Sequence, residues 1–345
     1  MNSFFLHSDL SNLDALQDAF PEVYEWIREF QSDQQEFTLH TSGSTGTPKE
    51  VAVSRRALEF SATNTLDFFK LKAGDTALLC LPVKFIGGKM MVVRALLRRL
   101  NMLIVSATSN PMEHLCGDEA IHFAAMTPMQ VSKVISSDNA KLLNGIAHLI
   151  LGGAPVSGGL EKQLQSFDVH CYETYGMTET VSHVALRKLN AEKEFHAVSM
   201  DIQFTTNPQN CLQIHAPYYS EDVILTNDVV ELISPTSFRW LGRFDFVVNS
   251  GGIKVHPEEI ERFLSPVIPH AFIVTGIPDE VLGEKLILII ETDQLSSDST
   301  IRINKRLTEI PNPYHCPKAI RTLSQFARTE NGKIQRHATR NLLRQ

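Results

Sequence analysis

The sequence lacks several features that whole classes of protein require. None of its apolar runs approaches the ~20 residues of a membrane-spanning helix, and no basic stretch precedes an apolar one at its start. The five cysteines form no Cys-x-x-Cys pair, and the thirteen histidines show no His-Glu-x-x-His or zinc-knuckle spacing. The net charge of -7 argues against nucleic acid as a main partner. We therefore expect a cytoplasmic protein with reduced thiols and no membrane insertion.

What is present is the composition of an ordinary globular protein. Of the 345 residues, 43% are hydrophobic and 21% are charged. This length can form two or three domains or subdomains with a substantial core. Because the chain as a whole is acidic, any site for an anionic ligand must be a local feature.

The densest cluster of small and polar residues is Thr-Ser-Gly-Ser-Thr-Gly-Thr-Pro-Lys at 41–49. It follows a predicted strand at 36–40 and precedes a predicted helix that begins near residue 54. Small residues let backbone N–H groups, hydroxyls and an ammonium converge on phosphate oxygens. The pattern is not a Walker A loop, because Pro-Lys-Glu at 48–50 replaces the required Gly-Lys-Ser/Thr. A solvated turn is the alternative. The phosphate-binding interpretation involves Thr41, Ser42, Gly43, Ser44, Thr45, Gly46, Thr47 and Lys49.

Two further stretches follow predicted strands. The strand at 148–151 runs into Gly-Gly-Ala-Pro at 152–155, and the strand at 168–172 leads to Tyr-Gly-Met-Thr-Glu-Thr at 175–180. Ligands of open α/β sheets bind at the carboxyl ends of strands. An aromatic ring there can stack on adenine, a hydroxyl can bond a phosphate, and a carboxylate can hold Mg²⁺. Each residue taken singly is more often structural, but together they predict a ligand site at this edge of the sheet, with Gly152, Gly153, Ala154, Pro155, Tyr175, Gly176, Thr178 and Glu179 as candidates.

Five stretches, in order along the chain, resemble the motifs of the adenylate-forming enzymes, which include acyl- and aryl-CoA synthetases, luciferases and peptide-synthetase adenylation domains. They lie at 41–49, 151–155, 175–180, 241–261 and 328–336. The resemblance implies an α/β fold with a large N-terminal domain of α/β layers and a small β subdomain, at 1–242. A small mobile α+β C-terminal domain would follow at 243–345. The segment before residue 41 is much shorter than in full-length relatives, so we interpret the chain as a compact version.

The same resemblance implies roles for single residues. ATP and Mg²⁺ would be bound, with coenzyme A as co-substrate, and the turn at 152–155 would lie along the adenine. Relatives have Gly-Asp where this chain has Asn-Asp at 227–228, and Asn tolerates the positive φ of the missing glycine. The implied roles are a ribose ligand at Asp228, a ribose and α-phosphate ligand at Arg243, a domain hinge at Asp245, a pantetheine tunnel beside Gly251 and Gly252, a metal ligand at Glu179, and catalysis by Thr178, Arg243 and Lys333.

The helix that begins near residue 86 would line the pocket for the acid. Phe85 stands where relatives often have a histidine, and Lys89 and Arg94 follow it. A cation in such a pocket suits an acid with a second carboxylate, because an Arg can hold a carboxylate bidentately. Within the family, the resemblance is nearest to the o-succinylbenzoate–CoA ligases of menaquinone synthesis.

Other interpretations of the sequence stay open. The chain could be another aryl- or short acyl-CoA ligase, or a degenerate relative that binds nucleotide and regulates. A peptide-synthetase adenylation domain is less favoured, because no carrier domain follows and no suitable Asp lies near Phe85. We expect a monomer or homodimer.

Overall fold

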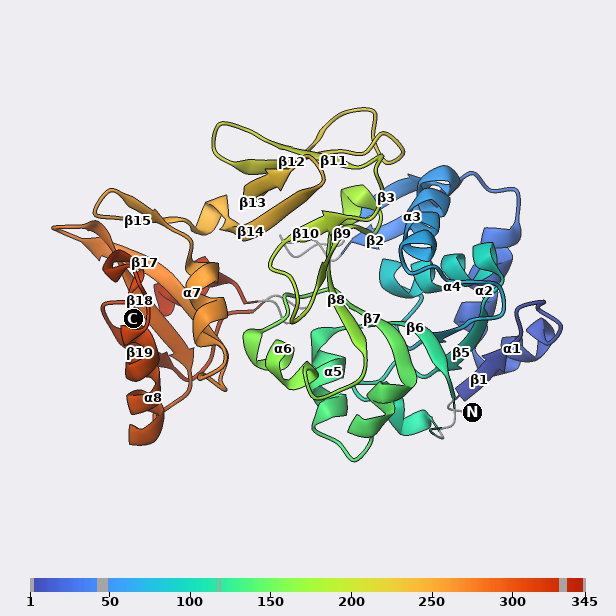
Figure 1. Cartoon of the computed structure of the whole chain (residues 1–345), viewed down its shortest axis with the longest axis horizontal. Coiled ribbons are helices and arrows are strands. Elements are labelled where there is room, and N and C mark those ends of the chain that lie inside the picture. Colours follow the sequence, from blue (N-terminus) through green and yellow to red (C-terminus); the bar gives the residue numbers. More distant parts are fainter. Residues whose placement is uncertain (1–2, 42–48, 116, 118, 329–333, 344–345) are drawn as a thin grey trace.

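The computed structural model of the chain describes residues 3–41, 49–115, 117, 119–328 and 334–343. The described residues form a mixed α/β fold, as the sequence predicts, with a twelve-stranded sheet, a five-stranded sheet and a two-stranded hairpin. Figure 1 shows the elements β15 to α9 gathered on the left and the earlier elements on the right. No helix of the described chain is both long enough and apolar enough to span a bilayer.

Five parallel strands form the centre of the large sheet, in the order β5-β4-β6-β7-β8. They are short and rich in apolar residues, as expected of parallel strands that are covered on both faces. Strand β1 adds to one edge in antiparallel fashion. The bounds are β1 Ser3–Leu6, β4 Thr76–Leu79, β5 Asn101–Val105, β6 Ile121–Met126, β7 Ile146–Leu151 and β8 His170–Gly176.

From β8 the sheet continues in antiparallel order through β9, β10, β14, β13, β12 and β11. The small β subdomain that the resemblance implies is therefore hydrogen-bonded to the main sheet through β9 and β10. This continuity brings β13 and β14 near the end of β8. The bounds are β9 His183–Lys188, β10 Phe195–Ala197, β11 Gln203–Thr206, β12 Cys211–His215, β13 Ile224–Ser234 and β14 Ser237–Arg243.

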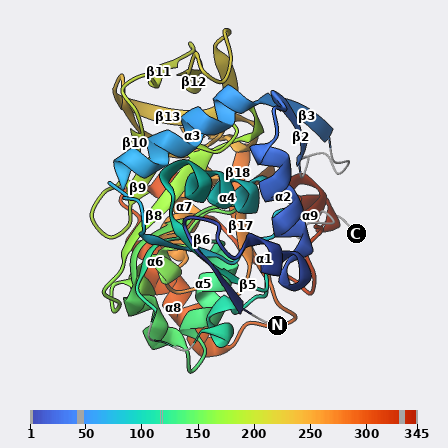
Figure 2. The ribbon, with the colours of Figure 1, turned by 90° about the vertical axis from the view of Figure 1, so that its right-hand side faces the viewer.

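Helices cover both faces of the parallel strands, because side chains of a strand alternate between its two faces. In β4, Ala77 and Leu79 enter the core that includes α2, α3 and α4, whereas Leu78 enters the core that includes α5 and α6. In Figure 2 the first set of helices lies in front of the sheet. The bounds are α1 Leu13–Ala19, α2 Pro21–Gln31, α3 Arg55–Phe68, α4 Ile86–Arg98, α5 Pro128–Ile135 and α6 Gly158–Leu164.

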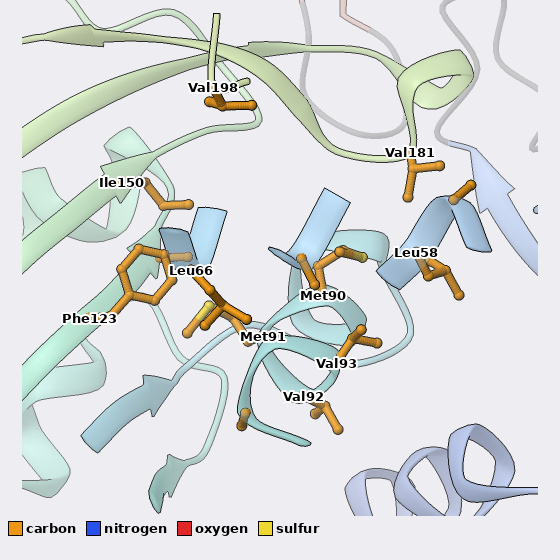
Figure 3. Close-up of a cluster of buried hydrophobic side chains, with 14 of the residues drawn as sticks. Leu58, Leu66, Met90, Met91, Val92, Val93, Phe123, Ile150, Val181 and Val198 are labelled. Atoms are coloured by element: carbon orange, nitrogen blue, oxygen red, sulfur yellow. The ribbon is translucent and has the colours of Figure 1, made fainter. Parts of the chain in front are cut away.

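Local sequence explains where these helices begin. The Ser54 hydroxyl accepts the N–H of Ala57 at the start of α3, and Thr127 and Gln130 form a reciprocal capping box at α5. Figure 3 shows Leu58 and Leu66 of α3 and Met90 and Met91 of α4 within one cluster with Phe123. Burying each such side chain contributes about 2 kcal/mol to stability, so α3 and α4 are firmly packed against the sheet.

The elements after β14 have cores of their own, in which β17, β18 and α7 take part. Strands β15 to β18 pair in antiparallel fashion and β19 pairs with β18 in parallel. The bounds are β15 Val248–Ser250, β16 Ile253–Val255, α7 Pro257–Leu264, β17 Phe272–Asp279, β18 Gly283–Glu291, α8 Ser297–Thr308, β19 Ile320–Leu323 and α9 Arg336–Leu342.

The remaining elements are short. Strands β2 and β3 form a hairpin in which Thr41 is opposite Lys49, so the segment 42–48 connects the two strands. Single 3-10 turns connect several other elements. The bounds are β2 Glu36–Thr41, β3 Lys49–Ser54, η1 Pro111–His114, η2 Ala140–Gly145, η3 Thr178–Thr180, η4 Phe244–Phe246 and η5 Pro313–His315.

Candidate functional site

The Gly-Gly turn follows β7 at the carboxyl edge of the parallel strands, as the sequence predicts. A Cβ on Gly152 would lie 2.7 Å from the Thr174 hydroxyl, and Gly153 has a φ of +84°. Both positions therefore strongly favour glycine. The Thr174 hydroxyl in turn donates to the carbonyl oxygen of Leu151, at 3.1 Å. These contacts join the turn to β8, the strand that carries Tyr175.

A buried ion-pair network holds the backbone just after the same turn. The N–H of Val156 donates to Glu173 Oε1 at 2.9 Å, and Arg187 Nη2 lies 2.8 Å from Glu173 Oε2. Arg187 also bonds Glu161, with Nη2 3.0 Å from Oε2. Neither Glu173 nor Arg187 is among the functional residues that the sequence predicts. The signal that could have indicated them is a carboxylate in the middle of the strand β8, with a basic residue, Arg187, in the strand β9 that follows.

Tyr175 and Asp228 lie together, although they come from different strands. The Tyr175 hydroxyl donates to Asp228 Oδ2 at 2.8 Å, and Trp240 Nε1 donates to Asp228 Oδ1 at 3.1 Å. The ring of Tyr175 packs edge-on against Phe195 and Phe238. Burial first, and the nearby Asp228 carboxylate second, hold the pKa of Tyr175 well above its usual value, so the hydroxyl remains a donor.

Close packing also fixes the turn that follows Tyr175. A Cβ on Gly176 would lie 2.3 Å from the carbonyl oxygen of Ser182, a contact that no side chain tolerates. Thr178 begins the 3-10 turn η3 and is half-buried, while Glu179 is exposed. An exposed carboxylate at this turn fits a Mg²⁺ ion, which is commonly held by one or two carboxylates together with substrate phosphates. Among the described residues, no group of three or more His, Cys, Asp or Glu could hold a metal by itself.

Arg243 lies opposite Asp228 in the register of β13 and β14. Its Nη2 is 2.9 Å from Asp245 Oδ2, in an ion pair that is partly open to solvent. Its main-chain N–H donates to Glu258 Oε1 at 3.1 Å. Asp228, Arg243 and Asp245 are thus neighbours at adjoining ends of β13 and β14.

Local turn geometry explains the two glycines predicted near the C-terminal elements. Gly251 and Gly252 form the two-residue turn between β15 and β16, with φ values of +61° and +82°. Such turns require positive φ at both positions. The segment 42–48 of the phosphate loop and Lys333 lie outside the described residues. Of Thr41 and Lys49, the structure describes only their backbone pairing in the β2–β3 hairpin.

The side chains of Lys89 and Arg94 leave helix α4 on different sides and contact different residues. The Lys89 ammonium lies 3.6 Å from the centroid of the Trp26 ring, and Trp26 Nε1 donates to the Lys89 carbonyl oxygen at 3.2 Å. Phe85 stands just before the helix and its side chain is exposed. The structure therefore brings Lys89 to α2 and does not bring it to Arg94.

Arg94 is only 2% exposed, which is unusual for a charged residue. Its Nη2 donates to the Ser182 hydroxyl at 3.2 Å, and its guanidinium faces the Phe123 ring. Burial lowers the pKa of Arg94 to about 10, so the group is still charged at neutral pH. No acidic side chain among the described residues forms an ion pair with it.

Arg94 Nε has no hydrogen-bond partner within the described structure. The Tyr219 hydroxyl lies near the guanidinium and interacts with the Ser61 hydroxyl and the Asn64 amide. Burial raises the pKa of Tyr219 to about 12. A cation with neutral hydrogen-bonding groups around it can bind an anion that carries further polar atoms.

The profile of the AMP-binding enzyme family matches residues 7–202, more than half of the chain. The chain belongs to the AMP-binding enzyme family. A crystal structure described as an acyl-CoA synthetase (AMP-forming)/AMP-acid ligase II-like protein from Dyadobacter fermentans is 33% identical. The match covers 99% of each chain, with a TM-score of 0.66. The chain is thus an enzyme of the AMP-forming acid–CoA ligase group within the AMP-binding family.

Other members of the AMP-binding enzyme family are more distant. The 2-succinylbenzoate–CoA ligase of Escherichia coli K12 is 26% identical over 320 residues, which is 86% of this chain and 67% of the relative. The o-succinylbenzoate CoA synthetase of Bacillus subtilis, solved with the acyl-adenylate intermediate, is 18% identical. The match covers 89% of this chain and 68% of the Bacillus subtilis chain, with a TM-score of 0.74. At this identity the likeness supports the fold alone.

Proposed function

We propose that this enzyme activates an acid with a second carboxylate, o-succinylbenzoate, as an acyl-adenylate and transfers the acyl group to coenzyme A, in menaquinone biosynthesis. The observation that carries the proposal is the buried Arg94 guanidinium without an acidic partner among the described residues. An isolated buried charge costs several kcal/mol. A substrate carboxylate would remove this cost, so the site favours a dicarboxylic acid over a monocarboxylic one.

The more distant relatives support the same substrate. Eight 2-succinylbenzoate–CoA ligases from several bacteria are between 22% and 26% identical to this chain. The acid of that name carries two carboxylates, one of which is free after thioester formation. Arg94 is suited to hold the free one bidentately.

The nucleotide would be held by residues from three strands. The Tyr175 ring would face the adenine, which the turn Gly152, Gly153, Ala154 and Pro155 would also contact. Asp228 accepts hydrogen bonds and is suited to the ribose hydroxyls, while Arg243 would reach the ribose and the α-phosphate. A mutual hydrogen bond already orients Tyr175 and Asp228 before any ligand is bound.

In the first step a carboxylate oxygen of the acid attacks the α-phosphorus of ATP and pyrophosphate leaves. Negative charge grows on the phosphate oxygens, so the useful groups are cations and donors already aimed at them. We assign this role to Lys333, Thr178, Arg243 and the loop 41–49. Glu179 would hold the Mg²⁺ ion, which neutralises phosphate charge when bound.

In the second step the thiol of coenzyme A attacks the acyl carbon and AMP leaves. AMP is a good leaving group, whereas the oxide of the free acid is not. The turn at Gly251 and Gly252 would lie beside the pantetheine arm. Asp245 would be the hinge between residues 1–242 and a domain formed by residues 243–345.

The proposal is tested by acid-dependent ATP–pyrophosphate exchange and by thioester formation with o-succinylbenzoate, benzoate, acetate and a medium-chain fatty acid. Arg94→Ala is compared with the control Arg98→Ala. Arg98 lies on the same helix, and its guanidinium pairs with Asp67 at the surface. Activity confined to o-succinylbenzoate, lost in Arg94→Ala and kept in Arg98→Ala, is expected. A preference for a monocarboxylate would leave the enzyme class intact and exclude this substrate.

A further inference from the structure

One face of helix α7 contacts the strand that carries Arg243. Residues 258, 262 and 265 are spaced by four and three positions, so they lie on the same side of a helix. Glu258 Oε1 accepts the main-chain N–H of Arg243 at 3.1 Å, and the Arg262 guanidinium lies 5.6 Å from the centroid of the Trp240 ring. The Ser265 hydroxyl accepts the N–H of Gly158 at 2.9 Å. In Figure 1, α7 accordingly stands beside both α6 and the end of β14.

These contacts reach residues that adjoin the proposed nucleotide ligands. Trp240 donates to Asp228, and Arg243 is opposite Asp228 in the strand register. Gly158 begins the helix that follows the Gly-Gly turn. Helix α7 therefore touches β14 and the start of α6, two segments that lead directly to proposed nucleotide ligands.

Glu258 is the buried member of the three. It is 9% exposed, and its second oxygen, Oε2, has no hydrogen-bond partner within the described structure. A Cβ on Gly242 would lie 2.4 Å from that oxygen, so the carboxylate packs directly on the backbone of β14. The start of a helix favours an acidic residue there, but this preference does not require that the carboxylate be buried against β14.

We infer that Glu258 is a positioning residue for the nucleotide site, because its carboxylate holds the backbone of β14 at Gly242 and Arg243. Arg262 assists by packing on Trp240, the donor to Asp228. This inference rests on the proposed nucleotide site. It implies that Glu258 and Arg262 contribute to ATP affinity without touching ATP.

The test uses the full-length chain and three variants of α7. Glu258→Ala removes the acceptor, Glu258→Gln retains an oxygen that can accept the Arg243 N–H, and Glu259→Ala removes a neighbouring carboxylate as a control. ATP affinity is measured by calorimetry, and backbone exchange at 239–243 by hydrogen–deuterium exchange. We expect Glu258→Ala to weaken ATP binding about tenfold, as for a lost hydrogen bond to a charged group, and to speed exchange at 239–243. Glu258→Gln should restore most of both, and Glu259→Ala should match the wild type.

The outcomes separate this inference from the proposed function. A folded Glu258→Ala that binds ATP as tightly as the wild type would overturn the positioning role and leave the proposed function standing. Equal losses in Glu258→Ala and Glu259→Ala would also overturn it, because the effect would then be one of general charge. If Glu258→Ala fails to fold, Arg262→Met provides the test. Weakened ATP binding in Arg262→Met, with unchanged affinity in Glu258→Gln, would support the positioning role. Unchanged ATP binding in Arg262→Met would count against the positioning role. A wild type that does not bind ATP would overturn both proposals.

Discussion

The hydroxyl of Tyr175 lies 2.8 Å from Asp228 Oδ2, although 53 positions separate the two residues in the sequence. The bond joins the end of β8 to β13 across the antiparallel part of the large sheet. It orients the carboxylate proposed to bind ribose and the ring proposed to face adenine. A single contact thus connects the two halves of the candidate nucleotide site.

Removing this hydroxyl is expected to weaken nucleotide binding. In Tyr175→Phe the ring remains but Asp228 loses one of the two side-chain donors that the described residues give it. A hydrogen bond to a charged group contributes about 1.5–3 kcal/mol. We expect KM for ATP to rise about tenfold while KM for the acid changes little. Steady-state kinetics with each substrate varied in turn measures this difference. Tyr172→Phe, on the same strand, is the control, and an equal effect in both variants would contradict the assignment.

Replacing Arg94 by Met is expected to change stability and activity in opposite directions. Met fills similar volume without charge. Replacing even a buried ion pair by apolar residues of similar volume is often neutral or stabilises a protein by about 1–4 kcal/mol, and a buried charge without an acidic partner has a larger desolvation cost to remove. Ligand-free Arg94→Met should therefore unfold at higher denaturant concentration than the wild type. Its kcat/KM for o-succinylbenzoate should fall about a hundredfold, because the second carboxylate loses its partner.

Both measurements are needed for Arg94. Arg98→Met is the control, because Arg98 pairs with Asp67 at the surface. If Arg94→Met were less stable and still fully active, the guanidinium would be a structural group with a partner in the folded protein.

Lys333 is expected to act in adenylation and not in thioester formation. In Lys333→Ala, pyrophosphate exchange should fall by several hundredfold or more, because a cation aimed at the developing phosphate charge is lost. Transfer from supplied acyl-AMP to coenzyme A should stay within a few fold of the wild type. The exposed Lys305 on α8 provides the control variant Lys305→Ala. Equal loss in both half-reactions would refute the role assigned to Lys333.

His183 is expected to make stability depend on pH between about 5 and 7. Burial first, and the Arg94 charge second, hold the pKa of His183 well below its usual value near 6.5. Below that pH the unfolded chain binds a proton that the folded chain does not, so stability falls as pH falls. The loss should approach about 1.4 kcal/mol per pH unit.

Denaturant unfolding at several pH values measures this effect. His183→Gln should show a flatter dependence than the wild type, whereas the exposed His270→Gln should not. Identical slopes for all three proteins would mean that His183 protonates equally easily in the folded and unfolded chains.

Local sequence was a good guide to most secondary structure. The predicted helix beginning near residue 54 is α3, where Ser54 caps the first turn, and the predicted strands at 36–40 and 148–151 are β2 and β7. Apolar periodicity and capping act over a few residues, so they can be recognised without the fold. The domain boundary placed at residue 243, and the motion about Asp245, stay predictions.

Contacts between distant segments could not be predicted in the same way. The sequence suggested both Lys89 and Arg94 for one pocket, yet Lys89 lies on Trp26 of α2 while Arg94 faces Ser182 near β9. Five positions on a helix correspond to different faces, and only the packing of α4 determines which neighbour each face meets. Trp240, Glu173 and Arg187 were missed for a related reason, because their partners come from other strands.

By itself the sequence determined the family, the order of the motifs and the places where glycine is required. These depend on residue identity and on short-range backbone geometry. The tertiary structure alone decided that Tyr175, Trp240 and Asp228 meet, that Arg94 is buried away from any described carboxylate, and that Glu258 lies against Gly242 and Arg243. Those arrangements arise from the pairing of strands and helices far apart in the chain, which no local pattern encodes.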